Sequence, residues 1–287
     1  MSQQALTILS IQSVVAYGHV GNSSAVFPLQ RLGHEVWPVP TVSFSNHTGY
    51  GTWRGRVLDP EDVAGVVTGI EERGVFGQCD AVLSGYLGAA QVGAVVLDAV
   101  RRVKAANPAA VFCCDPVMGD VDQGLYVRHG IPEFLRDEAV PQADILTPNQ
   151  FELGLLTGST VVTTDDLLAA VGRLRQAGPR TVLVTSVRTR ETPTGSIGMV
   201  AVSDDGAWAV STPLLPLAVN GAGDLTAALF LAHTMTASPR VALSRTAASV
   251  HAVLEATHRG GHPEIQIVAA QEAIARPDER FEVRALA

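Results

Sequence analysis

Short apolar runs, rich in β-branched residues, alternate along this 287-residue chain with longer stretches whose apolar residues recur at helical spacing. Strands are predicted at Leu6–Ile11, Asp80–Ser84, Ala110–Cys114, Asp144–Leu146 and Thr181–Val184, with extended chain at Val36–Val39 and Val42–Phe44. Helices are predicted at Asn22–Leu32, Pro60–Glu72, Ala90–Ala106, Leu225–Thr236, Pro239–Glu255 and Ile265–Ile274. Almost entirely apolar strands that alternate with helices are typical of a parallel sheet covered on both faces. The sequence therefore predicts an α/β fold.

Two segments depart from this alternation. Ile197–Val202 and Trp208–Ser211 flank the turn signal Asp204-Asp205-Gly206, which predicts an antiparallel hairpin. Ser45–Arg56 is polar, glycine-rich and aromatic without any period, which favours a loop that faces a ligand or closes over one. No linker, low-complexity tract or repeat interrupts the chain, so residues 1–287 are predicted to form a single domain.

Composition and charge exclude several classes of protein. With 47% hydrophobic and 17% charged residues, the chain is not expected to be disordered, and no apolar run approaches the ~18–20 residues of a membrane span. Met1–Ala5 has no basic residue ahead of an apolar core, so a secretory signal is not expected. The net charge of −8 disfavours nucleic-acid binding. An anionic small substrate would need a local cation such as Mg²⁺.

The three cysteines cannot all pair with one another. Cys113 and Cys114 are adjacent in a predicted strand, so their side chains are expected to point to opposite faces of the sheet. We interpret them as buried thiols of a protein in the reducing cytoplasm rather than as a redox pair.

The carboxyl ends of the predicted parallel strands carry oxygen-bearing side chains. These are Ser13, Tyr86, Asp115, Asn149 and Thr185, and Lys and Arg are almost absent from the same positions. Ligands of open α/β sheets bind beyond these strand ends. An edge rich in oxygen and poor in cationic groups suits Mg²⁺ that is held mostly through water and phosphate.

The most specific local feature is the turn Asn220-Gly221-Ala222-Gly223-Asp224, which is followed directly by an apolar helix. A glycine-rich turn that opens a helix presents unpaired backbone N–H groups to an anion such as phosphate. Asp224 alone could be an ordinary helix cap, but the two glycines favour the anion site. The dinucleotide pattern GxGxxG and the P-loop pattern GxxxxGK[ST] are both absent here.

Six segments carry a resemblance that covers nearly the whole chain. They are Ile11–Asn22 (IQSVVAYGHVGN), Phe44–Gly51 (FSNHTGYG), Ser84–Gly88 (SGYLG), Cys114–Gly119 (CDPVMG), Thr147–Glu152 (TPNQFE) and the Gly221–Asp224 turn (GAGD). On these motifs the chain resembles the pyridoxal kinases of the ribokinase-like superfamily. The turn is shared across the superfamily, and the first two segments are specific to its vitamin B6 branch.

The resemblance implies a three-layer α/β/α sandwich around a mostly parallel central sheet, assembled as a homodimer. It implies transfer of the γ-phosphoryl group of Mg·ATP to the 5′-hydroxyl of pyridoxal, pyridoxine or pyridoxamine, with a monovalent cation such as K⁺ as a further candidate cofactor. It also implies small-molecule partners only, without nucleic acid or membrane, and a cytoplasmic enzyme.

By matching position, the resemblance also implies roles for individual residues. Asp224 is expected to be the catalytic base, and the amides of Gly221, Ala222 and Gly223 the anion hole. Substrate contacts are expected from Ser13, Val20, His47, Thr48, Gly49, Tyr86 and Asp224, with Val219 near the ring. The nucleotide is expected near Asp115, Tyr126, Thr147, Glu152, Thr185, Thr212, Pro213, Leu214 and Leu215, and the metal near Asp115, Asn149 and Glu152. The segment Asp120–Tyr126 resembles one that covers the phosphates.

Departures from the family and alternative interpretations qualify these roles. Thr185 and Thr212 stand where relatives often carry Arg or Lys, and Leu125 stands where some relatives carry Cys. Asn149 and Glu152, three residues apart, also fit a capping box at a helix start. His251, His258 and His262 are interpreted as solvated residues near a helix end rather than as metal ligands.

Two other functions remain open on the sequence alone. One is a kinase of the same superfamily that acts on hydroxymethylpyrimidine. The other is a carrier or sensor of pyridoxal 5′-phosphate that uses the same scaffold with little turnover.

Overall fold

A computed structural model describes residues 5–286, so Met1–Gln4, on which the expectation about a signal segment largely rests, lie outside the described residues. In order across the main sheet, the strands are β12 (Arg284–Ala285), β11 (Gly206–Pro213), β10 (Ser196–Ser203), β9 (Thr181–Val187), β8 (Ile145–Leu146), β5 (Val111–Cys114), β4 (Ala81–Ser84), β1 (Thr7–Val15), β2 (Glu35–Phe44) and β3 (Gly55–Val57). The neighbours from β9 through β2 pair in parallel, and the strands at both edges pair antiparallel. The predicted mostly parallel sheet is therefore confirmed.

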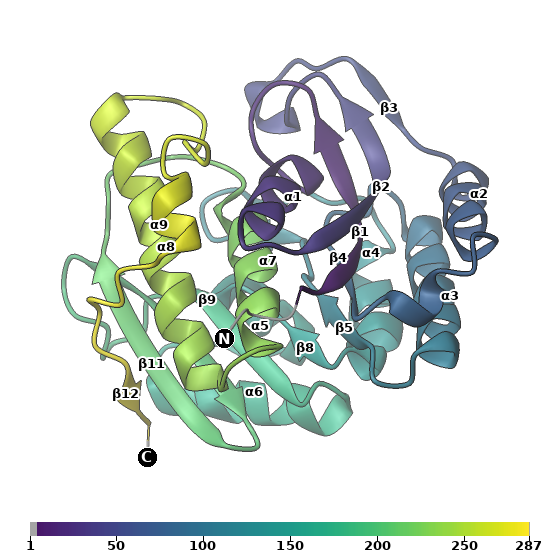
Figure 1. Cartoon of the computed structure of the whole chain (residues 1–287). Helices are drawn as coiled ribbons and strands as arrows, with labels where there is room; N and C mark the ends of the chain where they lie inside the picture. Colours follow the sequence, from purple (N-terminus) through teal and green to yellow (C-terminus); the bar gives the residue numbers. More distant parts are fainter. Residues whose placement is uncertain (1–4, 287) are drawn as a thin grey trace.

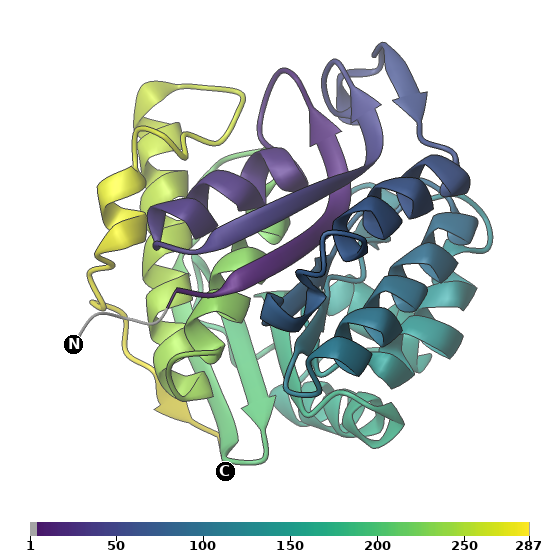
Figure 2. The same cartoon turned by 45° about the vertical axis from the view of Figure 1, so that its right-hand side comes forward.

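Helices cover both faces of this sheet, as Figures 1 and 2 show. They are α1 (Asn22–Arg31), α2 (Pro60–Glu71), α3 (Ala90–Ala106), α4 (Ile131–Phe134), α5 (Gln150–Thr157), α6 (Thr164–Ala177), α7 (Ala222–Thr234), α8 (Pro239–Gly260) and α9 (Gln271–Ala275). One core cluster joins the sheet to α2, α3, α5 and α6, and two others join it to α1, α7, α8 and α9. The predicted α/β/α layering is confirmed.

Adjacent residues of the central strands belong to cores on opposite faces of the sheet. Cys113 packs in the core beneath α1 and α7, whereas Cys114 packs in the core beneath α3. Both thiols are buried and free, as is that of Cys79. The expectation that the two adjacent thiols face opposite sides is thus confirmed, because side chains alternate along a strand.

The extended segments predicted around Pro38 and Pro40 form one continuous strand, β2, rather than two pieces. Both prolines pair with β1, whereas β3 pairs only with Val42–Phe44. Among the described residues, the other side of the proline stretch therefore has no strand neighbour, so a missing N–H group interrupts no ladder there.

The hairpin of β10 and β11 is confirmed, with Ser203 opposite Gly206. The helix predicted at Ile265–Ile274 is wrong for its first half, since only Gln271–Ala275 is helical. Ile265 and Ile267 are 0% and 1% exposed, whereas Gln266 between them is more accessible. These isoleucines anchor a non-helical segment in the core beside α7 and α8. Burying Ile265 and Ile267 while Gln266 stays more accessible requires successive side chains to point to opposite sides. An α-helix does not place residues i and i+2 on the same face.

Several elements were not predicted from the sequence, among them α4, α6, β3 and β12. The other differences are mostly in the ends of elements. β1 continues to Val15 and β9 to Val187, and α8 continues to Gly260. The helix predicted from Leu225 begins at Ala222, which brings the glycine turn into its first residues. A second, two-stranded sheet is formed by β6 (Gly119–Asp120) and β7 (Gly124–Leu125). Within residues 5–286, no helix is long and apolar enough to span a membrane.

Candidate active site

A cavity of about 490 Å³ opens at the carboxyl edge of the parallel strands. Its wall brings together residues that are far apart in the sequence but follow neighbouring strands. They are Ser13, Val15, Val20, Val42, Phe44, His47, Thr48, Gly49, Tyr86, Asp115, Val117, Asp120, Gln123, Tyr126, Thr147, Asn149, Glu152, Thr185, Ser186, Val219, Asn220, Gly221, Ala222, Gly223 and Asp224. A site beyond these strand ends is what the topology predicts.

The glycine turn forms one wall of the cavity and opens α7. Gly221 has φ 87°, a left-handed conformation that favours glycine, and no side chain caps the helix. A Cβ at Gly221 would lie 1.7 Å from the carbonyl oxygen of His19, so the turn packs tightly on the loop after β1. The Ser24 hydroxyl donates to the Gly221 carbonyl at 2.8 Å. The first N–H groups of α7 are therefore held facing the cavity as an anion site.

Asp224 lies in the first turn of α7, partly buried in the cavity wall. Burial raises the pKa of its carboxyl to about 6, against the opposing effect of backbone N–H groups, including that of Gly21. It is consequently ionised at neutral pH but more basic than an ordinary aspartate. Such a carboxylate can accept a proton from a bound hydroxyl.

Two further carboxyl groups lie in the same wall. Asp115, which follows β5, is 6% exposed, and its Oδ1 accepts a hydrogen bond from the Thr147 hydroxyl at 3.0 Å. Burial, together with the charges of Glu152 and Asp224, raises the pKa of Asp115 well above its usual range. Burial also raises the pKa of Glu152 to about 7. Among residues 5–286, no Lys or Arg lines the cavity, so its wall supplies no basic side chain to pair with these carboxyl groups.

Asn149 and Glu152 form a capping box at the start of α5. The Asn149 side chain also donates to the Gly119 carbonyl at 2.8 Å. Glu152 Oε1 accepts from the backbone N–H of Met118 at 2.8 Å, and Oε2 accepts from that of Asn149 at 2.9 Å. The capping interpretation is therefore confirmed. Both side chains hold the chain entering β6 in place beside Asp115.

The opposite end of the cavity lies beyond β1, β2 and β4. Ser13, Val20, His47, Thr48, Gly49 and Tyr86, predicted as substrate contacts, all line it together with Val219. The Gly49 N–H donates to His47 Nδ1 at 3.2 Å, and the Asn220 side-chain nitrogen lies 3.3 Å from His47 Nε2. Thr41 donates its hydroxyl to the Tyr86 carbonyl at 2.6 Å, which fixes the chain after β4. This end offers an aromatic ring and neutral polar groups to a flat substrate.

The predicted nucleotide residues do not all share this cavity. Asp115, Tyr126, Thr147, Glu152 and Thr185 line it. Thr212 is buried in β11, and Leu214 and Leu215 line a separate hollow of about 430 Å³ with Arg188 and Pro216–Ala218. Thr212, Pro213, Leu214 and Leu215 therefore lie beside the main cavity rather than in its wall. Ser186, next to Thr185, has φ 52°, a strained conformation for a residue with a side chain.

Comparison with known proteins shows the family of this chain. The family described as phosphomethylpyrimidine kinase matches residues 62–267. The chain is 61% identical to pyridoxal kinase PdxY of Rubrobacter xylanophilus over 98% of both chains, and 57% identical to pyridoxal kinase PdxY of Leifsonia xyli over 97% of this chain and 99% of that one. The chain belongs to the pyridoxal kinase family. The predicted family membership is confirmed.

A solved structure of this family agrees with the fold. Pyridoxal kinase from Leishmania donovani, in complex with ADP and pyridoxamine, superposes with a TM-score of 0.91 at 28% identity, covering 98% of this chain and 99% of that chain. The structural similarity therefore extends over 98% of this chain.

The family implies a divalent metal, and the cavity can be tested for it. Asp115 uses Oδ1 for Thr147, and no residue between 5 and 286 donates a hydrogen bond to its Oδ2. Within the described residues, no group of three or more His, Cys, Asp or Glu is arranged to enclose a metal. One free carboxyl oxygen in a wall without Lys or Arg among the described residues fits a divalent cation such as Mg²⁺, which keeps several waters and phosphate oxygens as ligands and favours the ionised carboxylate.

Residues that sequence reasoning did not find include the apolar wall at Val15, Val42, Phe44 and Val117. Glu264 was also missed. It is 6% exposed and contacts Tyr50 and His47 from the segment after α8. No motif marks Glu264, although the alternating burial of Ile265 and Ile267 is a signal for a buried segment next to it.

The interpretation of the three histidines needs one correction. His258 and His262 are exposed near the end of α8, as expected, but His251 is only 6% exposed. Its ring meets that of Phe281 edge-on at 5.0 Å. His251 is buried because the chain after α9 packs across α8, a long-range contact that the helical pattern does not reveal.

Proposed function

We propose that this enzyme transfers the γ-phosphoryl group of ATP to the 5′-hydroxyl of pyridoxal, and of pyridoxine and pyridoxamine. The observation that carries the proposal is the position of Asp224 and the Gly221–Gly223 amides between two ends of one cavity. One end carries Ser13, His47 and Tyr86 for the vitamin. The other carries Asp115, Thr147 and Thr185 for the nucleotide.

The protein groups would act mainly by positioning and by neutralising charge, as a loose phosphoryl-transfer transition state requires. Backbone N–H groups at Gly221–Gly223 would stabilise the charge that develops on the transferring group. Removing one such donor costs about 2.7–4 kcal/mol in other enzymes. Asp224, with its pKa raised to about 6 by burial, would accept the hydroxyl proton as the bond to phosphorus forms.

When bound, Mg²⁺ would supply positive charge that neutralises the phosphate groups. Asp115 would hold it directly or through water, and Thr147 would orient that carboxylate. Asn149 and Glu152 would support the site through the backbone they hold. A monovalent cation such as K⁺ is a further candidate cofactor. We also propose that the chain works as a single domain, as a homodimer and in the cytoplasm.

The decisive experiment follows ADP release from Mg·ATP with purified protein and pyridoxal. The expected result is ADP formation that depends on pyridoxal, with pyridoxal 5′-phosphate formed in equal amount. Tight binding of pyridoxal 5′-phosphate without ADP release would instead indicate a carrier or sensor.

A second candidate activity is supported by the match to the phosphomethylpyrimidine kinase family over residues 62–267. The same assay with hydroxymethylpyrimidine separates the two. We expect the higher kcat/KM with pyridoxal, because the Ser45–Gly51 segment and Tyr86 belong to the vitamin B6 pattern. A higher kcat/KM with hydroxymethylpyrimidine would reverse the assignment.

A further inference from the structure

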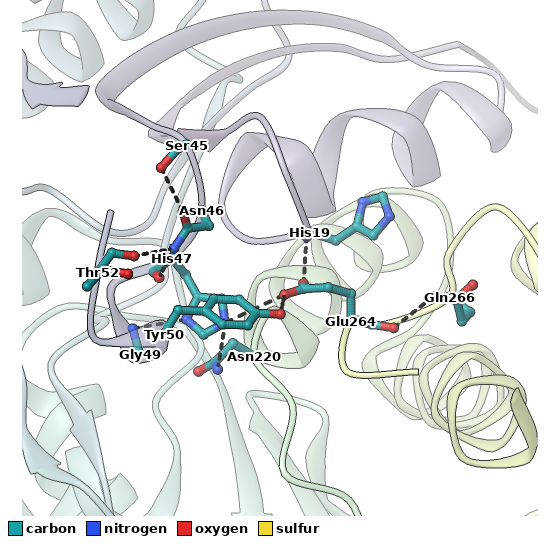
Figure 3. Close-up of polar contacts among 10 residues, drawn as sticks. All are labelled: His19, Ser45, Asn46, His47, Gly49, Tyr50, Thr52, Asn220, Glu264 and Gln266. Atoms are coloured by element: carbon teal, nitrogen blue, oxygen red, sulfur yellow. Dashed lines mark hydrogen bonds and ion pairs between the residues drawn. The ribbon is translucent and has the colours of Figure 1, made fainter. Parts of the chain in front are cut away.

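Glu264 lies in the non-helical segment between α8 and α9 and meets two other loops that are remote in sequence (Figure 3). Its Oε2 accepts a hydrogen bond from the backbone N–H of His19 at 3.1 Å. Its Oε1 accepts one from the Tyr50 hydroxyl at 2.6 Å and lies 3.7 Å from His47 Nε2. One carboxylate therefore joins the loop after β1 to the loop between β2 and β3.

The carboxylate itself is firmly anchored. Ile265 and Ile267 are buried in the core with Leu225 of α7 and Val253 of α8. The Gln266 N–H donates to the Thr257 hydroxyl at 2.9 Å, and the Gln266 side chain donates to the Glu264 carbonyl at 2.9 Å. Glu264 is consequently a fixed point against which more exposed segments can be placed.

The loop from Ser45 to Arg54, here called the flap, is in contrast exposed at every residue from Thr48 onward. Its internal bonds give it a shape: Asn46 donates to the carbonyls of His47 and Thr52, and the Ser45 N–H donates to the Arg54 carbonyl. These bonds do not place the flap relative to the cavity. At its tip, the Tyr50 hydroxyl bond to Glu264 does so, together with the contact of the Tyr50 ring with that of Tyr17 in the loop after β1, whose centroids are 6.1 Å apart.

The contacts of Glu264 with the loop after β1 also extend to the glycine turn. A Cβ at Gly18 would lie 2.3 Å from Glu264 Oε2, so the loop after β1 closes directly onto the carboxylate, aided by a φ of 89° at Gly18. The next residue, His19, packs its carbonyl oxygen against Gly221. Glu264 thus contacts the loop that packs against the glycine turn.

The same carboxylate faces the His47 ring. The ring Nδ1 accepts from the Gly49 N–H at 3.2 Å. Its Nε2 lies 3.3 Å from the Asn220 side-chain nitrogen and 3.7 Å from Glu264 Oε1. Glu264 therefore contacts the Nε2 edge of a ring that lines the vitamin end of the cavity.

From these contacts we infer that Glu264 is a positioning residue for the vitamin end of the active site, acting as a latch for the flap through Tyr50 and His47. The role rests on the proposed function for its effect on substrate, but the latch itself is a property of the free protein. Glu264 is not among the residues that line the cavity. It acts by holding closed the loop that carries His47, Thr48 and Gly49.

The test compares Tyr50→Phe, Glu264→Gln and Glu264→Ala with the matched control Glu272→Gln. Glu272 is an exposed residue in the first turn of α9. Among the described residues, its carboxylate pairs only with Arg31, at the surface. Tyr50→Phe keeps the ring and removes only the hydroxyl of an exposed residue, so the fold is preserved. Glu264→Gln keeps an acceptor oxygen for Tyr50 and should be the milder change at that position.

The first readout is hydrogen–deuterium exchange of residues 45–54 in the ligand-free protein. A hydrogen bond to a charged acceptor is worth roughly tenfold in an opening equilibrium. We expect exchange in the flap to rise by roughly that factor in Tyr50→Phe and Glu264→Ala, less in Glu264→Gln, and not at all in Glu272→Gln. Unchanged flap exchange in both Tyr50→Phe and Glu264→Ala would overturn the latch, whatever the activity.

The second readout is steady-state kinetics. The pyridoxal KM should rise roughly tenfold in Tyr50→Phe and Glu264→Ala while the ATP KM changes less than about twofold, and the double variant Tyr50→Phe/Glu264→Ala should be no worse than Glu264→Ala alone. Equal changes in both KM values would overturn the positioning role. If the parent protein releases no ADP with pyridoxal but its flap responds as described, the proposed function fails and the latch stands.

Discussion

Asn149 and Glu152 hold each other by reciprocal hydrogen bonds: the Asn149 side chain accepts from the Glu152 N–H, and the Glu152 carboxylate accepts from the Asn149 N–H, both at 2.9 Å. Glu152 also accepts from the Met118 N–H at 2.8 Å. The Glu152 carboxylate therefore accepts from backbone N–H groups of the chain after β8 and of the chain after β5. It supports the ends of both strands. This relationship gives Glu152 a testable role in stability.

We expect Glu152→Ala to lower the free energy of unfolding by about 3 kcal/mol, because it leaves buried N–H groups without an acceptor. Glu152→Gln should cost less, since one acceptor oxygen remains. Chemical denaturation measures both. Asp165→Asn, in the exposed first turn of α6, is the matched control and should change the free energy by less than about 0.5 kcal/mol. A loss for Glu152→Ala as small as the control's would contradict the supporting role.

Replacing Asp224 by Asn should remove the proton acceptor while keeping the size of the side chain. We expect kcat to fall by about 10²–10⁴-fold, the usual contribution of a general base, with the pyridoxal affinity largely retained. Single-turnover kinetics and pyridoxal binding measure the two quantities separately. Near-normal turnover in this variant would remove Asp224 from the proposed mechanism.

Tyr86 follows β4 directly and lines the vitamin end of the cavity. Tyr86→Ala removes an aromatic face from this end only, so the pyridoxal KM should rise by at least about tenfold, equivalent to the roughly 0.5–1.5 kcal/mol of an aromatic contact plus its buried area. The ATP KM should change little. Initial-rate kinetics with each substrate varied in turn give both values, and equal increases would argue against stacking on the pyridine.

The burial of His233 is expected to make the free energy of unfolding depend on pH. It is 3% exposed in α7, and neither ring nitrogen has a hydrogen-bond partner among the described residues. Burial, assisted by Arg245, lowers the pKa of His233 to about 4 from its usual 6.5. The unfolded state therefore binds more protons between these values, so this contribution to stability is present above pH 6.5 and is lost as the pH falls towards 4.

The lowered pKa of His233 is expected to change the free energy of unfolding by up to about 3 kcal/mol across this pH range. The stability of His233→Leu relative to the parent protein should therefore increase as the pH is lowered from 7 to 4. Denaturation at several pH values measures this difference, with the exposed His258→Gln as control. A pH-independent difference between His233→Leu and the parent protein would show that His233 does not titrate as described.

Most of the central strands and long helices, and the residues at the strand ends, could be predicted from the sequence, because both depend on local patterns; α6 was not predicted. Buried parallel strands are uniformly apolar, and the chain turns polar where each one ends, as at Asp115 and Asn149. The resemblance to the family added the chemistry of the GAGD turn. The structure places most of the predicted site residues around one cavity.

What the sequence did not reveal depends on contacts between distant segments. The Ile265–Ile274 pattern fits a helix, but Ile265 and Ile267 are instead buried in alternation against α7 and α8. No local pattern marks Glu264, because its partners lie in the flap and in the loop after β1, which are remote from it in the sequence. The burial of His251 has the same origin, since it depends on packing against Phe281.

The central claim is that Asp224 and the adjoining turn lie where the vitamin hydroxyl meets the transferring phosphoryl group. A crystal structure with pyridoxal and a nonhydrolysable ATP analogue tests it most directly. The account predicts an Asp224 carboxylate oxygen within about 2.6–3.2 Å of the 5′-hydroxyl oxygen, with the γ-phosphate against the Gly221–Gly223 amides. A carboxylate separated from that hydroxyl by a water layer or by another side chain would contradict the account.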